Sequence, residues 1–411
     1  MTLWAKVYWR SGGAAARGPR LLSKVHAEGL QLMQPNGWRE LPGPSPGSEA
    51  MSTKVSSGAE GGAAGVNATT LPVPVFAFTT RRGGNFPAQG EGLPRVRQLP
   101  QCHTTCLDDK RLMWECLAAA GCTDITPQTW VDVDALLLRD TCSRVSDGSG
   151  SRASDANSQV GGGSSNDHSS SSRSVSCPAL SRLDMGPWFL KHRHGVKGQA
   201  VYAFTSLQAL SARLSSISNA SRRNVVVQRD VHPPLLLHGR QFALRAHVLV
   251  TAAWPRRAAY VHRDVIVVEH AASYDPASAT KAVHVSSAGR GHPAPYLLES
   301  LADSKLANSL WQQICATSRA SVTATAQQLF PADPDHEAVF CHLWGYDVVA
   351  CQQGRAYLIE ANAYPAIASG TMAAVDRPVY TRLLQDLLTL VVLPAADGVA
   401  PVAGGFRQVP L

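Results

Sequence analysis

Several features that define common protein classes are missing from this sequence. No apolar run is long enough to cross a membrane, so we expect no membrane-spanning helix. The nine cysteines are odd in number and irregularly spaced, which argues against a complete disulfide framework. Cys102, His103 and Cys106 could form half of a metal site, but no second half follows, so structural thiols are expected there. No internal repeat is evident.

Acidic residues are the scarcer charge. The chain has 30 Asp and Glu against 38 Lys and Arg, a formal net charge of +8. A basic balance suits an acidic partner, which can be nucleic acid, anionic lipid or an acidic polypeptide. With 411 residues, 45% of them hydrophobic, the chain can form two or three domains around a substantial core.

The N-terminal region allows two interpretations. Its first 27 residues contain five basic side chains and no acidic one, as an organelle transit peptide would. We prefer a structural interpretation, in which residues 3–9 form a strand and residues 21–33 form a helix that ends before Pro35-Asn36-Gly37.

Two segments are poor in large apolar side chains. Residues 41–70 are rich in Gly, Ser, Pro and Ala, and residues 143–176 consist almost entirely of small and polar residues. Such segments cannot bury enough apolar surface to become ordered. Residues 41–70 are therefore predicted to be a flexible insertion, and residues 143–176 a disordered one.

The most informative stretch runs from Phe340 to Pro365. Two apolar runs flank a polar turn centred on Gln353-Gly354, which predicts a β-hairpin. In that register Asp347 and Glu360 lie opposite each other, and opposite residues of an antiparallel pair share a face. Asn362 follows Glu360 by two positions and joins the same face.

Three oxygen-bearing side chains thus converge among apolar neighbours. Two adjacent carboxylates repel each other unless a cation lies between them. A small set of hard oxygen ligands suits Mg²⁺ that is shared with nucleotide phosphates. The alternative is a solvated polar face on an edge hairpin.

These two strands carry a family resemblance. Leu343 to Asp347 and Leu358 to Pro365 resemble the metal-binding strands of the tubulin–tyrosine ligase-like proteins, which have an ATP-grasp fold. The resemblance implies that Asp347, Glu360 and Asn362 hold Mg²⁺.

Three further stretches resemble the nucleotide site of this family. Trp188-Phe-Leu-Lys191 matches a strand whose lysine meets the phosphates. The segment from His194 to Ala200 resembles a glycine-containing phosphate loop, with Lys197 and Gly198 as candidates. Val225 to Val231 resembles the hinge that reads adenine with its backbone. The resemblance implies nucleotide contacts from Gln228, Arg229 and Val231.

Two arginines complete the predicted site. Arg245 ends the Pro233–Arg245 match, and Arg263 ends Tyr260-Val-His-Arg263. A guanidinium can hold phosphate through two hydrogen bonds. A structural ion pair is the alternative for either one alone, but the resemblance implies that both clamp phosphate and act in catalysis.

Three positions depart from the family pattern. Gln241 stands where the family has lysine, Ala243 where it has aspartate and Ser287 where it has asparagine. These changes keep open an alternative in which the chain binds nucleotide or microtubules without full ligase activity.

The resemblance implies an α/β chain with an ATP-grasp fold and a small N-terminal α/β domain. The predicted parts are an N-terminal domain (1–93), a central domain (94–228), a C-terminal catalytic domain (229–398) and a tail (399–411). Helices are expected at residues 112–120, after Pro293 through Leu306, Leu310 and Ile314, and at 379–392.

The implied function is that of a ligase that uses ATP and Mg²⁺ to add an amino acid (Glu, Gly or Tyr) to a protein. The expected acceptor is tubulin, whose acidic tails suit the basic charge; another acidic protein is the alternative. We expect a monomer with no nucleic-acid or membrane partner, in the cytoplasm, on the cytoskeleton or in the cilium.

Overall fold

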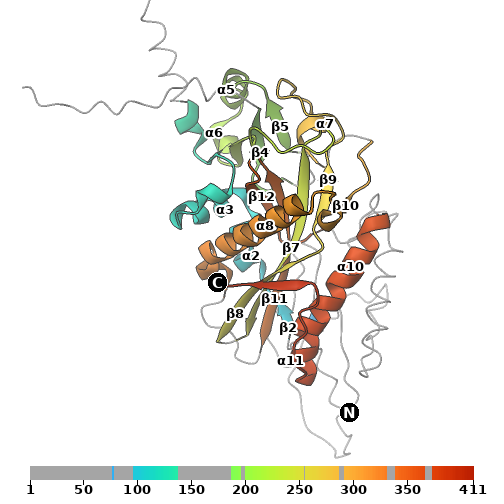
Figure 1. Cartoon of the computed structure of the whole chain (residues 1–411). Helices are drawn as coiled ribbons and strands as arrows, with labels where there is room; N and C mark the ends of the chain where they lie inside the picture. The colour runs from blue at the N-terminus through green and yellow to red at the C-terminus, as the bar shows by residue number, and fades with distance from the viewer. Residues whose placement is uncertain are drawn as a thin grey trace, which may run out of the picture.

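The computed structural model describes residues 76–77, 96–137, 187–195, 200–253, 255–286, 291–330, 338–365 and 373–411. Several predictions lie outside these residues: almost all of the N-terminal domain, both insertions, and Lys197, Gly198 and Ser287. The described part is a mixed α/β structure with two sheets, which confirms the predicted fold class (Figure 1). None of its helices combines the length and apolar character needed to cross a bilayer.

The larger sheet has nine strands in the described residues and is built around β7 and β11. Its main path runs β1-β2-β11-β7-β8-β13, while β12 pairs with β11, β9 pairs with β7, and β10 pairs with β9. The strands are β1 (Phe76–Ala77), β2 (Val96–Gln98), β7 (Phe242–Ala253), β8 (Arg256–His262), β9 (Ile266–Glu269), β10 (Tyr296–Leu297), β11 (Val339–Ala350), β12 (Ala356–Asn362) and β13 (Phe406–Val409).

Helices cover both faces of this sheet. Along β7, Leu244, Ala246 and Val248 face the hydrophobic cluster that contains α8 (Ser304–Ala324), while Leu249 belongs to the cluster of α10 (Ala373–Leu387). Successive residues of a strand point to opposite faces, so a strand that is covered on both sides becomes apolar at almost every position. This explains the long apolar runs of β7 and β11.

The helix predicted after Pro293 is α8. It begins after Asp303, whose side chain accepts a hydrogen bond from the Leu306 backbone N–H at 3.0 Å, as an N-cap does. The fourfold spacing of Leu310 and Ile314 places both fully buried side chains on the sheet. Figure 1 shows α8 lying across one face of the larger sheet.

The smaller sheet has the order β3-β6-β4-β5. Its strands are β3 (Thr129–Trp130), β4 (Trp188–His192), β5 (Val201–Phe204) and β6 (Val225–Arg229). Leu190 and Val227 of this sheet pack with Leu210 of α5 (Leu207–Ser215) in a hydrophobic cluster of their own. The short helix α6 (Asn219–Arg222) precedes β6.

Two consecutive helices lead into the site. Asp109 separates α2 (Gln101–Asp108) from α3 (Lys110–Ala119), and its carboxylate caps α3 by accepting hydrogen bonds from the backbone N–H groups of Arg111 and Leu112. The same buried carboxylate pairs with Arg193 at 2.6 Å. This fixes the first turn of α3 beside the end of β4.

The remaining elements are short, with one exception near the C-terminus. They are the 3-10 helices η2 (Thr123–Ile125) and η4 (Leu298–Ser300), and the helices α7 (Lys281–His284) and α9 (Ala326–Leu329).

The helix expected at 379–392 is longer, because α10 continues through a π-helical segment, η5 (Leu388–Val392), into α11 (Leu393–Asp397). Residues 399–411, expected to be a tail, contribute β13 to the edge of the larger sheet beside β8.

The contact between α8 and the sheet gives a stability prediction. Leu310→Ala should lower the free energy of unfolding by about 2–5 kcal/mol, because Leu310 is fully buried and its removal leaves a cavity. Gln312→Ala, at an exposed position of the same helix, should change it by less than about 0.5 kcal/mol. Urea denaturation of both variants measures the difference; equal effects would contradict this packing.

Candidate active site

A cavity of about 420 Å³ lies between the two sheets. Both sheets line it: Phe189 and Lys191 come from the smaller one, and Arg245 and Asp347 from the larger one. The structure brings most of the predicted site residues together here, namely Lys191, Gln228, Arg229, Val231, Arg245, Asp347, Glu360 and Asn362. The volume is within the range of ligand pockets in proteins.

The predicted hairpin is confirmed. Strands β11 and β12 pair antiparallel with Asp347 opposite Glu360 and Gly345 opposite Asn362. The turn contains Gly354 at φ +77°, a conformation that suits glycine. The ladder shifts register immediately after Asp347, so the bulge lies next to the acidic pair. Bulges often re-aim side chains beside active sites.

Each carboxylate has its own cation. Arg245 lies opposite Asp347 on β7 and donates two hydrogen bonds to it, from Nε to Oδ1 at 2.6 Å and from Nη2 to Oδ2 at 3.0 Å. Lys110, at the start of α3, has its Nζ 2.8 Å from Oε2 of Glu360. The same ammonium donates to the carbonyl of Gly195 at 3.0 Å.

The pKa values of the two carboxyl groups shift in opposite directions in these surroundings. Burial raises the pKa of Asp347; the Arg245 guanidinium opposes this shift, and the nearby Glu360 carboxylate adds to it. Burial also acts upward on Glu360, but the charges of Lys110 and Lys191 outweigh it and lower the pKa of Glu360 to about 2. Opposite shifts in neighbouring carboxyl groups are typical of functional sites.

Lys191 reaches the cavity from β4. Its side chain is buried, and its Nζ donates a hydrogen bond to Oε1 of Gln228 on the neighbouring strand β6. Burial lowers the pKa of Lys191 to about 8, and the charge of Glu360 acts against that shift. Because the Lys191 ammonium makes this hydrogen bond to a neutral partner, it can still donate hydrogen bonds to an anion in the cavity.

The donor set fits a magnesium ion shared with a ligand. Asp347 and Glu360 offer carboxylate oxygens. Asn362 lies beside both, and its Nδ2 donates to Asp347 at 3.2 Å and to Glu360 at 3.4 Å, so its amide oxygen is the atom that could bind a metal. Within the described residues no group of three or more His, Cys, Asp or Glu could hold a metal ion. Mg²⁺ in nucleotide enzymes commonly uses one or two carboxylates, phosphates and water.

Gly345 keeps the room that this arrangement needs. A Cβ atom at this position would lie 2.9 Å from Cβ of Pro365 and 3.5 Å from the side chain of Arg245. Glycine therefore allows the segment after β12 to pass close to β11 while Arg245 extends to Asp347.

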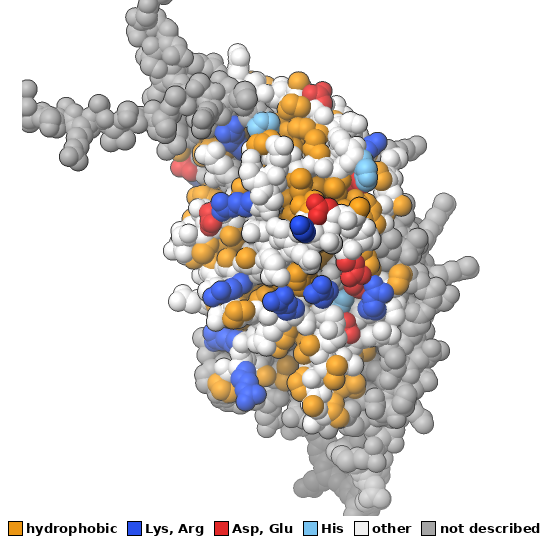
Figure 2. Space-filling view, viewed as in Figure 1, with side chains coloured by type: hydrophobic (Ala, Val, Ile, Leu, Met, Phe, Trp, Pro, Cys, Tyr) orange, Lys and Arg blue, Asp and Glu red, His pale blue; other side chains and the backbone are white. Residues whose placement is uncertain are grey.

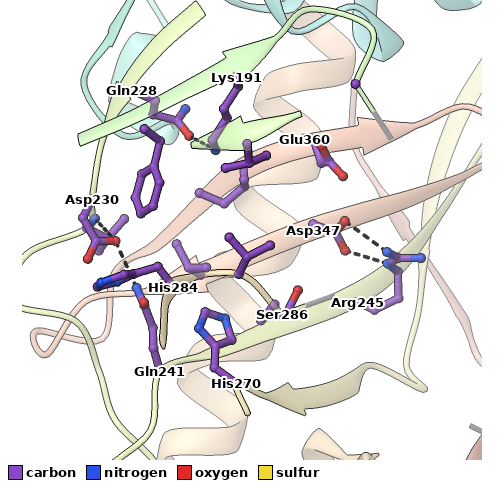
Figure 3. Close-up of a pocket in the computed structure, with 18 of the residues that line it drawn as sticks. Lys191, Gln228, Asp230, Gln241, Arg245, His270, His284, Ser286, Asp347 and Glu360 are labelled. Atoms are coloured by element: carbon purple, nitrogen blue, oxygen red, sulfur yellow. Dashed lines mark hydrogen bonds and ion pairs between the residues drawn. The ribbon is translucent and has the colours of Figure 1, made fainter. Parts of the chain in front are cut away.

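The opposite end of the cavity contains a polar cluster around Asp230, a residue that the sequence did not indicate. Asp230 follows β6 and accepts hydrogen bonds from the Gln241 amide at 3.0 Å, the Val231 backbone N–H at 2.9 Å and the Tyr274 hydroxyl at 3.3 Å. Burial raises the pKa of Asp230, and these donors from Gln241 and Val231 oppose the shift. His284 lines the same end. Figure 3 shows this group on one side and Arg245, Asp347 and Glu360 on the other.

Comparison with known proteins assigns the family. A profile of the tubulin-tyrosine ligase family matches residues 95–287 and 293–398, well over half of the chain. The chain belongs to this family. Its ATP-grasp type of fold agrees with the two sheets on either side of the cavity, and the resemblance identified from the sequence is confirmed.

One curated relative within the tubulin-tyrosine ligase family is named "Probable tubulin polyglutamylase ttll-9", from Caenorhabditis elegans. It is 27% identical over 209 residues, which cover 45% of this chain and 47% of the relative. The chain therefore spans about half the length of that protein.

Arg263 is the predicted family residue that the structure places elsewhere. Its guanidinium lies over the ring of Trp311 on α8, 5.4 Å from the centroid. Val261 pairs with Val248, and both face the α8 cluster, whereas Arg245 points to the other face of β7. The contact with Trp311 places Arg263 on the α8 side. We therefore leave Arg263 out of the phosphate site.

Lys110 provides a test of how a neighbouring positive charge lowers the pKa of Glu360. Lys110→Met should raise the pKa of Glu360 from about 2 toward its ordinary value of 4.5 and lower the free energy of unfolding at pH 7 by about 2 kcal/mol. The stabilisation belongs to the ionised carboxylate. It is complete above about pH 4.5 and is lost as the pH falls toward 2.

The difference between Lys110→Met and wild type should therefore shrink over that acidic range in urea denaturation experiments. Lys305→Met, which changes an exposed lysine on α8, serves as the control and should have little effect at any pH. A pH-independent difference for Lys110→Met would show that lost packing, not the Glu360 pair, is responsible.

Proposed function

We propose that this protein is a ligase that uses ATP and Mg²⁺ to join an amino acid to a protein carboxyl group. The observation that carries the proposal is the cavity lined by Lys191, Arg245 and the Asp347–Glu360 pair, with Lys110 paired to Glu360 behind it. Cations beside paired carboxylates suit a magnesium-bound triphosphate, whose negative charges and metal complement both kinds of group.

The reaction has two chemical steps. An oxygen of the acceptor carboxylate attacks the γ-phosphorus of ATP, and the bond to the β-phosphate oxygen breaks, which releases ADP. The amine of the second substrate then attacks the activated carbonyl carbon, and inorganic phosphate leaves as the amine gives up a proton. Both steps move negative charge between oxygens, so positioning and charge stabilisation supply most of the catalysis.

Residues of the cavity suit these roles. We assign Lys191 and Arg245 to the phosphates, since both bring fixed cations into the site. Asp347, Glu360 and Asn362 are the groups that would hold Mg²⁺, which when bound neutralises charge on the phosphates. Gln228, Arg229 and Val231 form the part of the wall expected to meet the base and ribose.

Tubulin is the acceptor we favour. The relative from C. elegans is named for polyglutamylation of tubulin, which supports tubulin as acceptor and glutamate as the added amino acid; Gly and Tyr remain alternatives. Figure 2 shows a band of Lys and Arg side chains across the face on which Figure 1 places α8 and β8. Exposed arginines on and beside α8, β8 and β13 are Arg256, Arg257, Arg263, Arg319 and Arg407.

Such a surface would attract an acidic polypeptide tail at a rate that falls with ionic strength. An acceptor of this kind also implies that the protein acts in the cytoplasm, on the cytoskeleton or in the cilium, and we propose that it does so as a monomer.

Nucleotide binding can be tested directly. We expect ATP with Mg²⁺ to bind, and Lys191→Ala to weaken binding about 10-fold or more, because a buried charge-assisted hydrogen bond contributes roughly 1.5–3 kcal/mol. Calorimetry of wild type and variant measures this. Lys305→Ala is the control. No heat from wild type up to millimolar ATP would refute the ligase proposal, and an unchanged affinity in Lys191→Ala would remove Lys191 from the site.

Turnover tests the carboxylate pair. Glu360→Gln should leave the protein folded but reduce incorporation of labelled amino acid into purified tubulin on the order of 100-fold, since a charge that stabilises the transition state is lost. Glu299→Gln, at an exposed position, should retain full activity. Mass spectrometry with Glu, Gly and Tyr identifies the product. Full activity of folded Glu360→Gln would exclude this site.

If wild type binds ATP but modifies neither tubulin nor another acidic protein, the chain is a nucleotide-binding member of the family without ligase activity.

A further inference from the structure

Two buried polar atoms at one end of the cavity have no hydrogen-bond partner. They are Oε1 of Gln241 and Nδ1 of His284. Both residues line the cavity, with only 3% and 7% of their surfaces exposed. A buried polar group without a partner is costly, and in a ligand cavity it indicates where a ligand's complementary group belongs.

The orientation of the Gln241 amide follows from its neighbour. Its Nε2 lies 3.0 Å from Oδ1 of Asp230, and a carboxylate accepts hydrogen bonds. The NH₂ group must therefore face Asp230, which directs the carbonyl oxygen away from Asp230. The hydrogen bonds to Asp230 from Tyr274 and from the backbone of Val231 fix that carboxylate in turn. Gln241 thus presents an acceptor.

The tautomer of His284 follows in the same way. Its Nε2 lies 2.7 Å from the carbonyl oxygen of Ser278, which can only accept, so Nε2 carries the hydrogen. In the neutral imidazole, Nδ1 then has a lone pair and no hydrogen. The second unpartnered atom is also an acceptor.

The two acceptors belong to one cluster. Asp230 accepts a hydrogen bond from Gln241, and Gln241 and His284 line the same cavity as Asp230. The ring of Tyr274 joins them, because its hydroxyl donates to Asp230 and its centroid lies 5.8 Å from that of His284. Figure 3 shows Asp230, Gln241 and His284 next to one another, apart from Arg245 and Asp347.

Apolar side chains occupy the wall between this cluster and the charged end. Phe189, Val231, Ala243, Val349 and Ile359 line the cavity, which suits a flat ring. A ligand that reaches from one end to the other therefore combines an anionic group, an apolar ring and a hydrogen-bond donor at the far edge of that ring.

We infer that Gln241 and His284 are specificity-determining residues that accept hydrogen bonds from the exocyclic amino group of the nucleobase. The inference rests on the proposed function, in which the ligand is ATP. A 6-amino group has two N–H donors and satisfies both atoms, whereas a 6-oxo group brings another acceptor against them. This makes the departure from lysine at position 241 a change from donor to acceptor at the base.

The first experiment compares ligands on the unaltered protein. Calorimetry with Mg²⁺ should give ATP an affinity on the order of 10- to 100-fold higher than inosine triphosphate, which has oxygen in place of the amino group. The triphosphate of purine riboside, with hydrogen at that position, should also bind more weakly than ATP.

The second experiment assigns the preference to side chains. Gln241→Met and His284→Phe keep the size of each side chain and remove the acceptor. Each should lower ATP affinity about 10-fold while leaving the affinity for the purine riboside triphosphate nearly unchanged. Gln98→Met is the matched control, since Gln98 is buried on β2 and does not line the cavity. It should leave all three affinities unaltered.

The outcomes separate the two proposals. If wild type binds none of the three nucleotides, the proposed function fails. If it binds them equally, the ligase proposal stands and the specificity inference is refuted. The inference is also refuted if folded Gln241→Met and His284→Phe both keep the wild-type preference for ATP over the purine analogue. If a variant does not fold, N6,N6-dimethyl-ATP provides the test on wild type, because its dimethylamino group has no N–H donor. If it binds wild type as tightly as ATP does, the inference is refuted.

Discussion

The site depends on a pair of like charges that the hairpin brings together. Asp347 and Glu360 lie opposite each other on β11 and β12, and their repulsion opposes folding unless cations approach. Arg245 on β7 approaches one carboxylate, and Lys110 on α3 the other. Sheet register fixes the first cation, and the Asp109 cap at the start of α3 fixes the second. The larger sheet, α3 and the end of β4 are thus arranged around this acidic pair.

The hairpin was predictable because strand pairing has a strict period of two. The predicted opposition of Asp347 and Glu360 is present, but the turn alone does not produce it. Beside the turn Ala350 pairs with Ala356, a register that would put Asp347 opposite Ile359, and the bulge after Asp347 shifts the pairing by one residue to Glu360. Arg245 was found because the stretch Pro233–Arg245 resembles the family pattern. Arg263 follows the last residue of β8, His262, so the alternation of faces along the strand does not fix the direction of its side chain. In the structure its guanidinium lies over the ring of Trp311.

Lys110 and Asp230, and the contacts of Asp230 with Gln241 and Tyr274, were not predictable from the sequence. Their contacts join segments that are far apart in the chain: Lys110 meets a residue 250 positions later, Glu360, and Asp230 meets a tyrosine 44 positions later. No local pattern marks such pairs. Position 241 was recognised only as a departure from the family. Its chemical meaning emerged when the structure showed which amide atom Asp230 holds.

The cavity lies between two sheets that have separate hydrophobic cores. Leu190, Val227 and Leu210 belong to the core of the smaller sheet, while Val248 and Ile314 belong to that of the larger one. Two cores allow two cooperative units, which can unfold at different temperatures. A ligand bound to both sheets links their unfolding equilibria, because it dissociates when either unit opens. The nucleotide would therefore act as a structural element of the protein, merging two melting transitions into one.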